Sequence, residues 1–228
     1  MNEVAVSEQG RRRLPTRGRV WLWAFVVLAS FLAWTAWRIW PRSTSTLAWT
    51  AELGGGGVRR VDYTWDGKGL VALNIIGQVS VHDAATGRKI GQFDTGMTSC
   101  RDVAPHPVAP LCAVATDREV QIWNFADKEL PRRRKLDWNV RAIAYSDDGL
   151  RLAVAGGSRD DARTDEPEPT FGRVVVFNAD DLKDDVAPVE LSIEVEEVAL
   201  SANGRYVAAA SLQGGVKVFE TETGRLVA

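Results

Sequence analysis

The stretch that decides the fold is Gly215-Val216-Lys217-Val218-Phe219-Glu220-Thr221-Glu222-Thr223-Gly224, a short alternating strand followed by a polar turn. Similar strands end at three earlier places, so that an aromatic or imidazole ring recurs at His82, Trp123, Phe177 and Phe219. The spacings between these rings are 41, 54 and 42 residues. A period of about 40–45 residues, with several short strands in each unit, is the sequence signature of propeller blades. The sequence therefore predicts an all-β propeller of about four blades.

A turn dipeptide precedes the end strand in three of the units: Asp66-Gly67, Asp148-Gly149 and Asn203-Gly204. From turn to strand end takes 16 residues in the first and fourth units but 29 in the third, an excess of 13. The distance from one strand end to the next turn stays at 25 or 26 residues. The additional residues therefore lie in one loop, 158–170, and leave the repeat itself intact, as repeat folds allow.

The inserted loop is acidic and rich in proline, and two interpretations of it stay open. It is either a solvated loop or a docking element for a protein partner. The candidate contact residues are Asp160, Asp161, Asp165, Glu166 and Glu168. Calcium binding by these carboxylates is a further alternative, but the glycine-centred spacing of an EF-hand loop is missing, and we predict no metal site.

Charge is distributed unevenly along the 228 residues. Five arginines and two glutamates precede Val20, which gives +3, and Arg38 and Arg42 add +2. Because the whole chain carries −2, the remainder must carry −7. Nucleic acid is an improbable partner for so acidic a body, because binding to phosphates needs clustered positive charge.

An uncharged, apolar stretch follows the basic head from Val20 to Trp37, and Ile39 and Trp40 extend it. Eighteen residues of helix span about 27 Å, close to the roughly 30 Å of a bilayer core. Trp21 and Trp23 mark one end of the stretch. Trp34, Trp37 and Trp40 mark the other. Such aromatic belts are typical of membrane interfaces, and the sequence predicts a transmembrane helix over residues 20–40.

The arginine cluster sets the predicted orientation of this anchor. Positive residues remain in the cytoplasm, so residues 1–19 form a disordered cytoplasmic tail and the repeats lie on the opposite side of the membrane. A buried core helix and a cleaved signal peptide are the alternatives, the latter with Thr46-Leu47-Ala48 as the cleavage site. The apolar run is longer than a signal peptide usually has, which favours an uncleaved anchor.

The remaining chain divides into a spacer and four units. Residues 41–57 form the spacer, in which Leu47–Leu53 is a candidate strand able to close a propeller as the outer strand of its last blade. Alternation and turn residues place the repeat domain at residues 58–228. Its blades are expected at about 58–94, 99–137, 140–193 and 195–228.

The repeated motifs resemble those of WD40 repeats. Ser146-Asp147-Asp148-Gly149 is similar to the Ser-Pro-Asp-Gly turn of that family, and the 215–224 stretch resembles its strand ending Gly-x-Val-x-Val-Trp-Asp with a Thr-Gly turn. Residues 79–88 match the same ending almost as well. The resemblance covers about residues 47–228 and implies a propeller that binds other proteins.

Two features depart from the family pattern. The Gly-His dipeptide is missing and no strand ending carries the literal Trp-Asp, so the buried hydrogen-bond network of regular WD40 blades cannot be carried over and rigidity is expected from packing alone. In the second unit the turn is replaced by a proline-rich loop over residues 105–110. Four units are also few for a family that most often has seven blades. They form either a small closed ring or part of a larger one, with free edges open to self-association.

Isolated reactive residues are interpreted as structural. His82 occupies a blade-end position, and His106 has no cysteine or carboxylate at the spacing of zinc ligands. A hairpin that pairs Ala104 with Leu111 would leave Cys100 and Cys112 about 10 Å out of register, too far for a disulfide, so both thiols are expected to be free and buried. Residues 132–135 are interpreted as an exposed outer strand.

No catalytic triad, phosphate-binding loop or dinucleotide motif is present in the sequence. The predicted function is therefore a non-catalytic, membrane-anchored interaction scaffold without a cofactor, exposed outside the cytoplasm. A fragment of a larger propeller protein, or an enzyme-like propeller of the quinoprotein or lactonase type, is the alternative.

Overall fold

A computed structural model describes residues 48–52, 56–97, 99–125, 130–158, 171–186, 188–211 and 214–228. The predicted basic tail, the predicted anchor and most of the acidic insertion lie outside these residues. Residues from 48 onward form one compact unit. Within the described part of the chain, none of the elements is a helix with the length and apolar character needed to cross a membrane.

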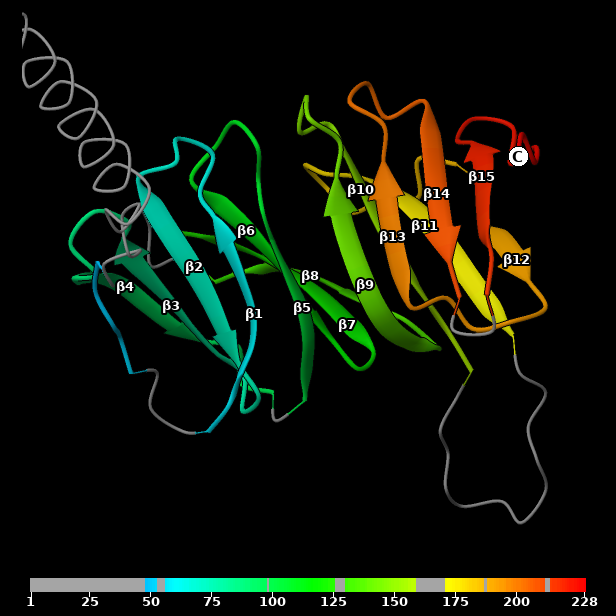
Figure 1. The fold of residues 1–228 in the computed structure, drawn as a ribbon. Coiled ribbons are helices and arrows are strands. Elements are labelled where there is room, and N and C mark those ends of the chain that lie inside the picture. Colours follow the sequence, from blue (N-terminus) through cyan, green and yellow to red (C-terminus); the bar gives the residue numbers. More distant parts are fainter. Residues whose placement is uncertain are drawn as a thin grey trace, which may run out of the picture. The chain divides into compact units, whose positions relative to one another are not determined.

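The described strands form four antiparallel sheets, each a blade in which consecutive strands lie side by side (Figure 1). Blade 1 contains β1 (Val58–Tyr63), β2 (Gly69–Asn74), β3 (Gln78–Asp83) and β4 (Lys89–Asp94). Blade 2 contains β5 (Cys100–Pro105), β6 (Leu111–Thr116), β7 (Glu119–Asn124) and β8 (Arg132–Lys135). Blade 3 contains β9 (Asn139–Tyr145), β10 (Arg151–Gly157), β11 (Gly172–Asn178) and β12 (Val189–Leu191). Blade 4 contains β13 (Glu197–Leu200), β14 (Tyr206–Ala210) and β15 (Val216–Glu220).

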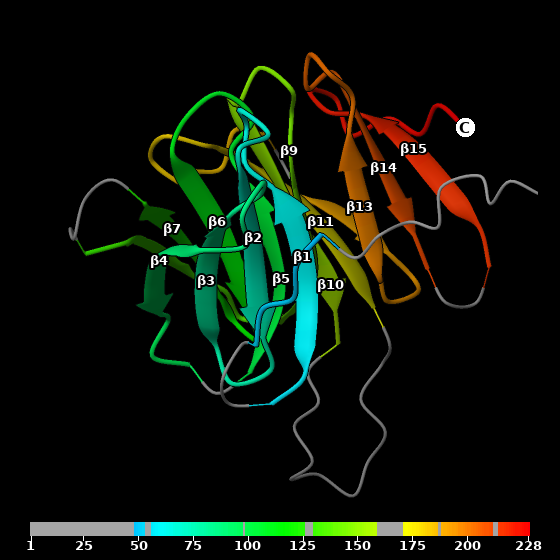
Figure 2. The same ribbon diagram turned by 60° about the vertical axis from the view of Figure 1, so that its left-hand side comes forward.

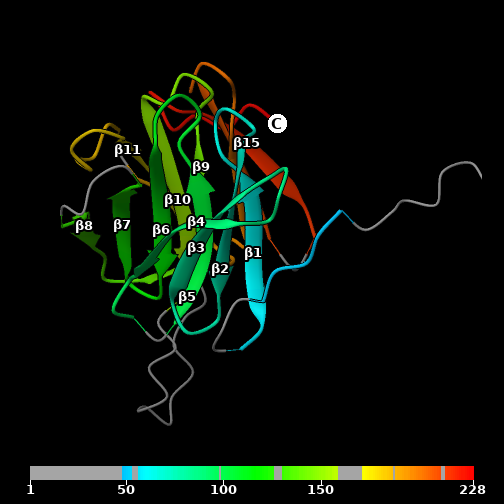
Figure 3. The same cartoon turned by 90° about the vertical axis from the view of Figure 1, so that its left-hand side faces the viewer.

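The first strand of each blade packs against the first strand of the next, so β1, β5, β9 and β13 line the inner side of the array (Figures 2 and 3). The fourth strands lie outermost, as in a propeller. The fourth position of blade 4 holds a single bridge, between Phe219 and Leu226. An all-β propeller-like fold is thus confirmed.

Identical turns join the first two strands of blades 1, 3 and 4. In blade 3 the hydroxyl of Ser146 donates to Asp148 Oδ1 over 2.6 Å and accepts the amide of Arg151 over 3.1 Å. Thr64 with Asp66, and Ser201 with Asn203, make the same bonds in blades 1 and 4. The glycine that follows has a φ of +65°, +74° and +65° in the three blades, a conformation that residues with a Cβ rarely adopt.

Apolar contacts between neighbouring blades form the core. Each of three buried clusters joins one pair of blades, and the one between blades 2 and 3 contains the largest fully buried side chain, that of Trp138. Valine and alanine dominate because two sheets can approach closely only over small side chains. Both faces of blades 2 and 3 are covered in this way.

The array does not close into a four-bladed ring. All six residues of β1 are exposed, whereas most residues of the equivalent strands β5 and β9 are buried or half-buried. Among the residues that the structure describes, the first face of blade 1 therefore has no neighbouring blade.

The register predicted for the second hairpin is wrong by two residues. Ala104 pairs with Ala113, and Cys112 pairs with Pro105. The ladder also skips Arg101, which forms a β-bulge that the sequence does not reveal. Cys100 lies opposite Thr116, near the other end of the hairpin, and both thiols are free and buried as expected. Burial raises the pKa of each thiol.

The expected closing strand over Leu47–Leu53 is not formed by its described residues, Ala48–Glu52. Trp49 instead packs on blade 1, where its indole stacks on His82 with ring centroids 6.3 Å apart and donates to the carbonyl of Ala84 over 2.9 Å. Gly87 makes room for the ring, because a Cβ at this position would lie 2.6 Å from the indole. The Trp49 indole thus attaches this segment to blade 1, in place of the strand pairing that was expected.

Packing is not the sole source of blade rigidity, which corrects the expectation from the sequence. A buried polar relay crosses blade 2, in which Trp123 Nε1 donates to Gln121 Oε1 and Gln121 Nε2 donates to Glu119 Oε1, each over 2.8 Å. The same amide donates to the carbonyl of Thr95 in the preceding loop over 3.2 Å. Arg133 lies 3.5 Å from Glu119 and neutralises its charge. The relay ties blade 2 to the end of blade 1.

We expect the Gln121→Met variant to lose roughly 2–4 kcal/mol of unfolding free energy. Gln121 is fully buried, and its replacement leaves Trp123 Nε1 without its acceptor and the Thr95 carbonyl without this donor, at about 1–3 kcal/mol for each unpaired group. Urea denaturation measures the change. Gln92→Met, at an exposed site on β4, is the matched control and should change stability little; equal effects of the two substitutions would contradict a stabilising relay.

Candidate interaction surface

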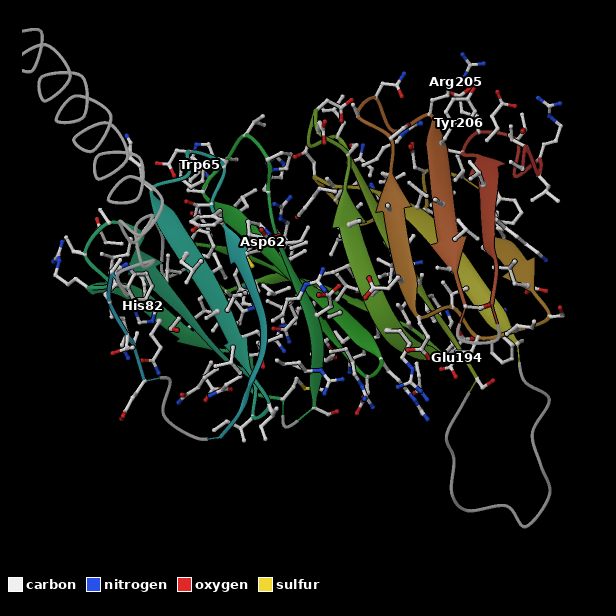
Figure 4. The ribbon with its side chains drawn as sticks, viewed as in Figure 1. Asp62, Trp65, His82, Glu194, Arg205 and Tyr206 are labelled. Atoms are coloured by element: carbon white, nitrogen blue, oxygen red, sulfur yellow. The ribbon has the colours of Figure 1, made fainter. Side chains whose placement is uncertain are left out.

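The two ends of the array differ in the chemistry that they present. Trp65, Arg205 and Tyr206 lie at the end formed by the turns between first and second strands, and Glu194 lies at the opposite end (Figure 4). We call these the turn end and the bulge end. The bulge end is so named because the ladder between the first and second strands is irregular there in blades 1, 2 and 3.

An arginine occupies the irregular position in each of these three blades. The pairing skips Arg59 in β1, Arg101 in β5 and Arg141 in β9. Blade 4 has Glu196 at the corresponding place, just before β13. A bulge turns its side chain away from the regular alternation of the strand. Three guanidinium groups and one carboxylate are therefore displayed on neighbouring blades at the same end.

Specific contacts hold these arginines in position. Arg59 Nε donates to the carbonyl of Arg101 over 3.1 Å. Arg101 Nε lies 2.7 Å from Asp117 Oδ1, and Arg141 Nε lies 2.8 Å from Glu194 Oε1. The side chains of Arg101 and Arg141 keep 25% and 23% of their area exposed. They are thus fixed in direction but still able to contact a partner.

A buried carboxylate lies beneath this surface. Asp102 is 5% exposed and accepts the amides of Val103 over 2.9 Å and of Ile143 over 3.0 Å. Arg60 Nε approaches it to 3.3 Å, and Arg60 Nη1 lies 4.0 Å from Glu197 on blade 4. Burial raises the pKa of Asp102, while the hydrogen bond from Ile143 and the charge of Arg60 oppose that shift. Two ion pairs and the hydrogen bond from Ile143 thus connect inner strands of all four blades.

The turn end contains a polar cavity of about 420 Å³ between blades 3 and 4. Its lining residues are Asp148, Leu150, Arg151, Asn203, Arg205, Glu220 and Glu222. Arg151 is already engaged, at 2.7 Å from Asp185 and 3.6 Å from Glu222. Hydrogen bonds from Thr223 and Arg205 lower the pKa of Glu220. The cavity's charged groups are therefore paired with one another, which favours a structural role.

The blade-end residues lie on third strands and serve different local contacts. His82 Nδ1 donates to Gly87 O and Nε2 accepts from Ser80, each over 3.0 Å. Trp123 stacks on Phe93 with centroids 4.5 Å apart. Phe177 and Phe219 are buried between blades. The structure therefore does not bring these four residues together into one site.

His106 takes the place that Ser or Thr holds in the other blades. Its Nε2 donates to the carbonyl of Gly149 in blade 3 over 3.1 Å, and its Nδ1 accepts the amide of Val108 over 3.2 Å. The bond from Val108 requires the neutral imidazole, and burial lowers the pKa of His106, although the bond to Gly149 opposes that shift. A hydrogen bond from His106 thus connects the proline-rich loop 105–110 to blade 3.

Other predicted sites have different outcomes. The predicted anchor residues and the acidic contact residues of the insertion lie outside the described residues. Residues 132–135 form the outer strand β8, where Arg134 lies 3.1 Å from Asp184 of blade 3. In the part of the chain that the structure describes, no group of three or more His, Cys, Asp or Glu residues is arranged to hold a metal ion.

The bulge arginines were missed by the sequence reasoning, although a signal for them existed. Arg59, Arg141 and Glu196 each precede the turn glycine of their unit by eight residues. An alignment of the units on their turn glycines would have shown that these residues occupy equivalent positions in their blades. The alignment would still not have shown the β-bulges at these positions.

Comparison with known proteins supports the architecture. No family model matches this chain. A WD repeat-containing protein of Dictyostelium discoideum is 30% identical over 76 residues, which are 33% of this chain and 15% of that protein. The small ribosomal subunit protein RACK1y of Oryza sativa subsp. japonica is 30% identical over 137 residues, 58% of this chain and 36% of that protein. The aligned regions thus span well under half of either relative. Together with four antiparallel sheets, they support a WD40-like β-propeller.

We expect acid to weaken the junction between blades 2 and 3 through His106. Because the folded state keeps this imidazole neutral, its pKa is lower than in the unfolded chain, and stability falls as the pH drops below about 6.5. The loss reaches at most about 1.4 kcal/mol per pH unit for one proton. Urea denaturation across this range measures it, and His106→Asn should remove that part of the slope. An unchanged slope in the variant would contradict the assignment.

Proposed function

We propose that this protein is a non-catalytic interaction scaffold, anchored in a membrane, that binds a protein partner at the bulge end of its blades. The observation that carries the proposal is the alignment of Arg59, Arg101 and Arg141 on successive inner strands, with Glu196 in line on blade 4. Arginine is enriched in protein interfaces, since one side chain supplies several hydrogen bonds in a fixed geometry.

Preorganisation supports this surface as the binding site. Ion pairs hold Arg101 and Arg141 before any partner arrives, which reduces the entropy lost on binding. The charge changes sign along the array, from Arg59 and Arg60 on blade 1 to Glu196 and Glu197 on blade 4. A partner with carboxylates opposite Arg59 on blade 1 and cations opposite blade 4 would be electrostatically complementary, since Asp117 and Glu194 already balance the charges of Arg101 and Arg141.

The similarity to known proteins agrees with a scaffold role. The rice relative is named as a small ribosomal subunit protein, so a protein with related repeats is a component of a larger assembly. The proposed anchor is supported by the uncharged stretch at residues 20–40 and its flanking tryptophans. The five arginines before Val20 support a cytoplasmic N-terminus and a propeller outside the cytoplasm.

The proposed orientation predicts that a tag after Ala228 is digested when protease is added to intact cells that expose this side of the membrane. A tag before Met1 should remain protected until the membrane is permeabilised. Immunoblotting of both tags gives the result. Protection of the C-terminal tag in sealed cells would rule out a propeller displayed outside the cytoplasm, and it would leave the scaffold role to be judged by the next experiment.

We expect Arg101→Ala together with Arg141→Ala to reduce recovery of cross-linked partners at least about tenfold, since a central interface arginine contributes roughly 2 kcal/mol. Quantitative mass spectrometry after cross-linking in cells measures the recovery. Arg134→Ala is the matched control, because it removes an arginine and an ion pair from the outer strand β8. Equal recovery from the two variants would contradict binding at the bulge end.

A further inference from the structure

A small pocket lies at the bulge end between blades 3 and 4. Its volume is about 70 Å³, and its lining comes from the end of blade 3 and from β14 and β15 of blade 4. Glu194, in the segment that joins the two blades, lies at the bulge end (Figure 4). In the same segment, Val195 donates its amide to the carbonyl of Gly156 over 3.2 Å, and Glu196 donates its amide to the carbonyl of Ala210 over 2.9 Å. Backbone hydrogen bonds to both blades therefore fix this side of the pocket.

The neighbouring junction shows which side chains fill the equivalent space. Between blades 2 and 3, one buried cluster contains three side chains that are 0–5% exposed: Trp138, Val154 and Val175. Ile193 replaces the tryptophan between blades 3 and 4, since each of these residues precedes the turn glycine of its blade by 11 residues. The pair of Ala209 and Lys217 replaces the pair of valines on the second and third strands. The pocket thus exists because two of these three positions have smaller side chains in blade 4.

The lining of the pocket is largely apolar and contains one cation. Leu191, Ile193, Val195 and Ala209 contribute hydrocarbon side chains. Lys217 is the charged residue of the lining, and it forms no ion pair with another residue in the part of the chain that the structure describes. An apolar group with a carboxylate beside it would therefore be complementary to this pocket.

The pocket faces the interior of the array and not the far side of blade 4. Lys217 pairs with Ala209 across β14 and β15, and directly opposite residues of an antiparallel pair lie on the same face of the sheet. Ala209 is 4% exposed and belongs to the core between blades 3 and 4. Both residues therefore lie on the side of blade 4 that is turned toward blade 3.

We propose that this pocket binds a small branched aliphatic side chain of the protein partner, with a neighbouring carboxylate of the partner beside Lys217. The inference rests on the proposed binding of a partner at the bulge end, and it names the chemical groups that this partner brings there. The cations expected opposite blade 4 concern Glu196 and Glu197 at the inner strand β13, whereas Lys217 lies on β15. The two charge contacts are therefore separate.

The volume of the pocket limits the side chain that it can accept. A dry cavity of about 150 Å³ holds a benzene ring, so a pocket of about 70 Å³ suits roughly three or four carbon atoms. Valine and leucine have side chains of this size, whereas an aromatic ring is too large. The bound hydrocarbon also excludes water from the surroundings of Lys217, which strengthens the attraction between its ammonium group and a carboxylate.

Peptide probes test the proposal by saturation-transfer NMR on the full chain in mild detergent, with empty micelles as the blank. The first probe is acetyl-Gly-Val-Asp-Gly-amide. In one matched peptide glycine replaces the valine, and in the other asparagine replaces the aspartate. Saturation should reach the valine methyl protons of the first probe, and the signal should be about twofold to fivefold weaker for the asparagine peptide, as expected for one partly exposed ion pair. The peptide without valine should give no signal above the blank.

Two variants of the protein connect this binding to the pocket. Ala209→Val should fill the pocket and reduce the signal of the first probe at least about fivefold, and it is compatible with folding because Val154 holds the same position in blade 3. Ala208→Val is the matched control, since Ala208 is half-buried on the same strand but faces away from blade 3. Lys217→Met changes an exposed residue and should reduce the signal of the first probe to that of the asparagine peptide.

Equal signals from Ala209→Val and Ala208→Val would overturn the proposal, as would wild-type binding that needs neither the valine nor the aspartate of the probe. Cross-linking in cells separates this failure from a failure of the proposed function. If no probe binds while partner recovery still depends on Arg101 and Arg141, only the groups assigned to the partner are wrong. If the probe binds but recovery is independent of these arginines, binding of the partner at the bulge end is wrong, and the role of the pocket in that binding is overturned with it.

Discussion

The structure depends on one constraint, which is that every blade must bury two apolar faces. A single sheet of three or four short strands covers neither of its own faces, so stability comes from stacking against neighbours. The valines at the inter-blade positions show the effect directly, because Val120 and Val174 are buried and Val216 is not. The exposure of this valine therefore distinguishes the end of the array from its middle.

Polar groups in the array are arranged so that they do not weaken this stacking. Asp102 is buried between inner strands but receives two backbone amides and a guanidinium, which offsets much of the cost of removing a charge from water. In blade 2, the buried groups of Gln121 and Glu119 are likewise hydrogen-bonded, to each other and to Trp123. The arginines of the bulge end extend from this fixed framework, so their directions follow from the packing below them.

Most of the fold was predictable, because repeat spacing, turn glycines and alternation are local signals. The free, buried state of Cys100 and Cys112 was likewise predicted from their positions in the sequence. The register around Cys112 was not predictable, since a bulge at Arg101 depends on contacts across the hairpin rather than on residue type. The candidate interaction surface was harder to predict from the sequence. Arg59, Arg101 and Arg141 look like ordinary surface residues there, and only the stacking of the blades brings them to the same end of the array.

Trp49 also sets how a mechanical load would enter the domain. Trp49 precedes β1, which begins at Val58, along the chain. A pull from the N-terminal side therefore acts first on the indole, its bond to Ala84 and its stack on His82. The force reaches the outer half of blade 1 before it reaches the inner strand. The Trp49 indole thus shields β1 from this load for as long as its contacts with Ala84 and His82 hold.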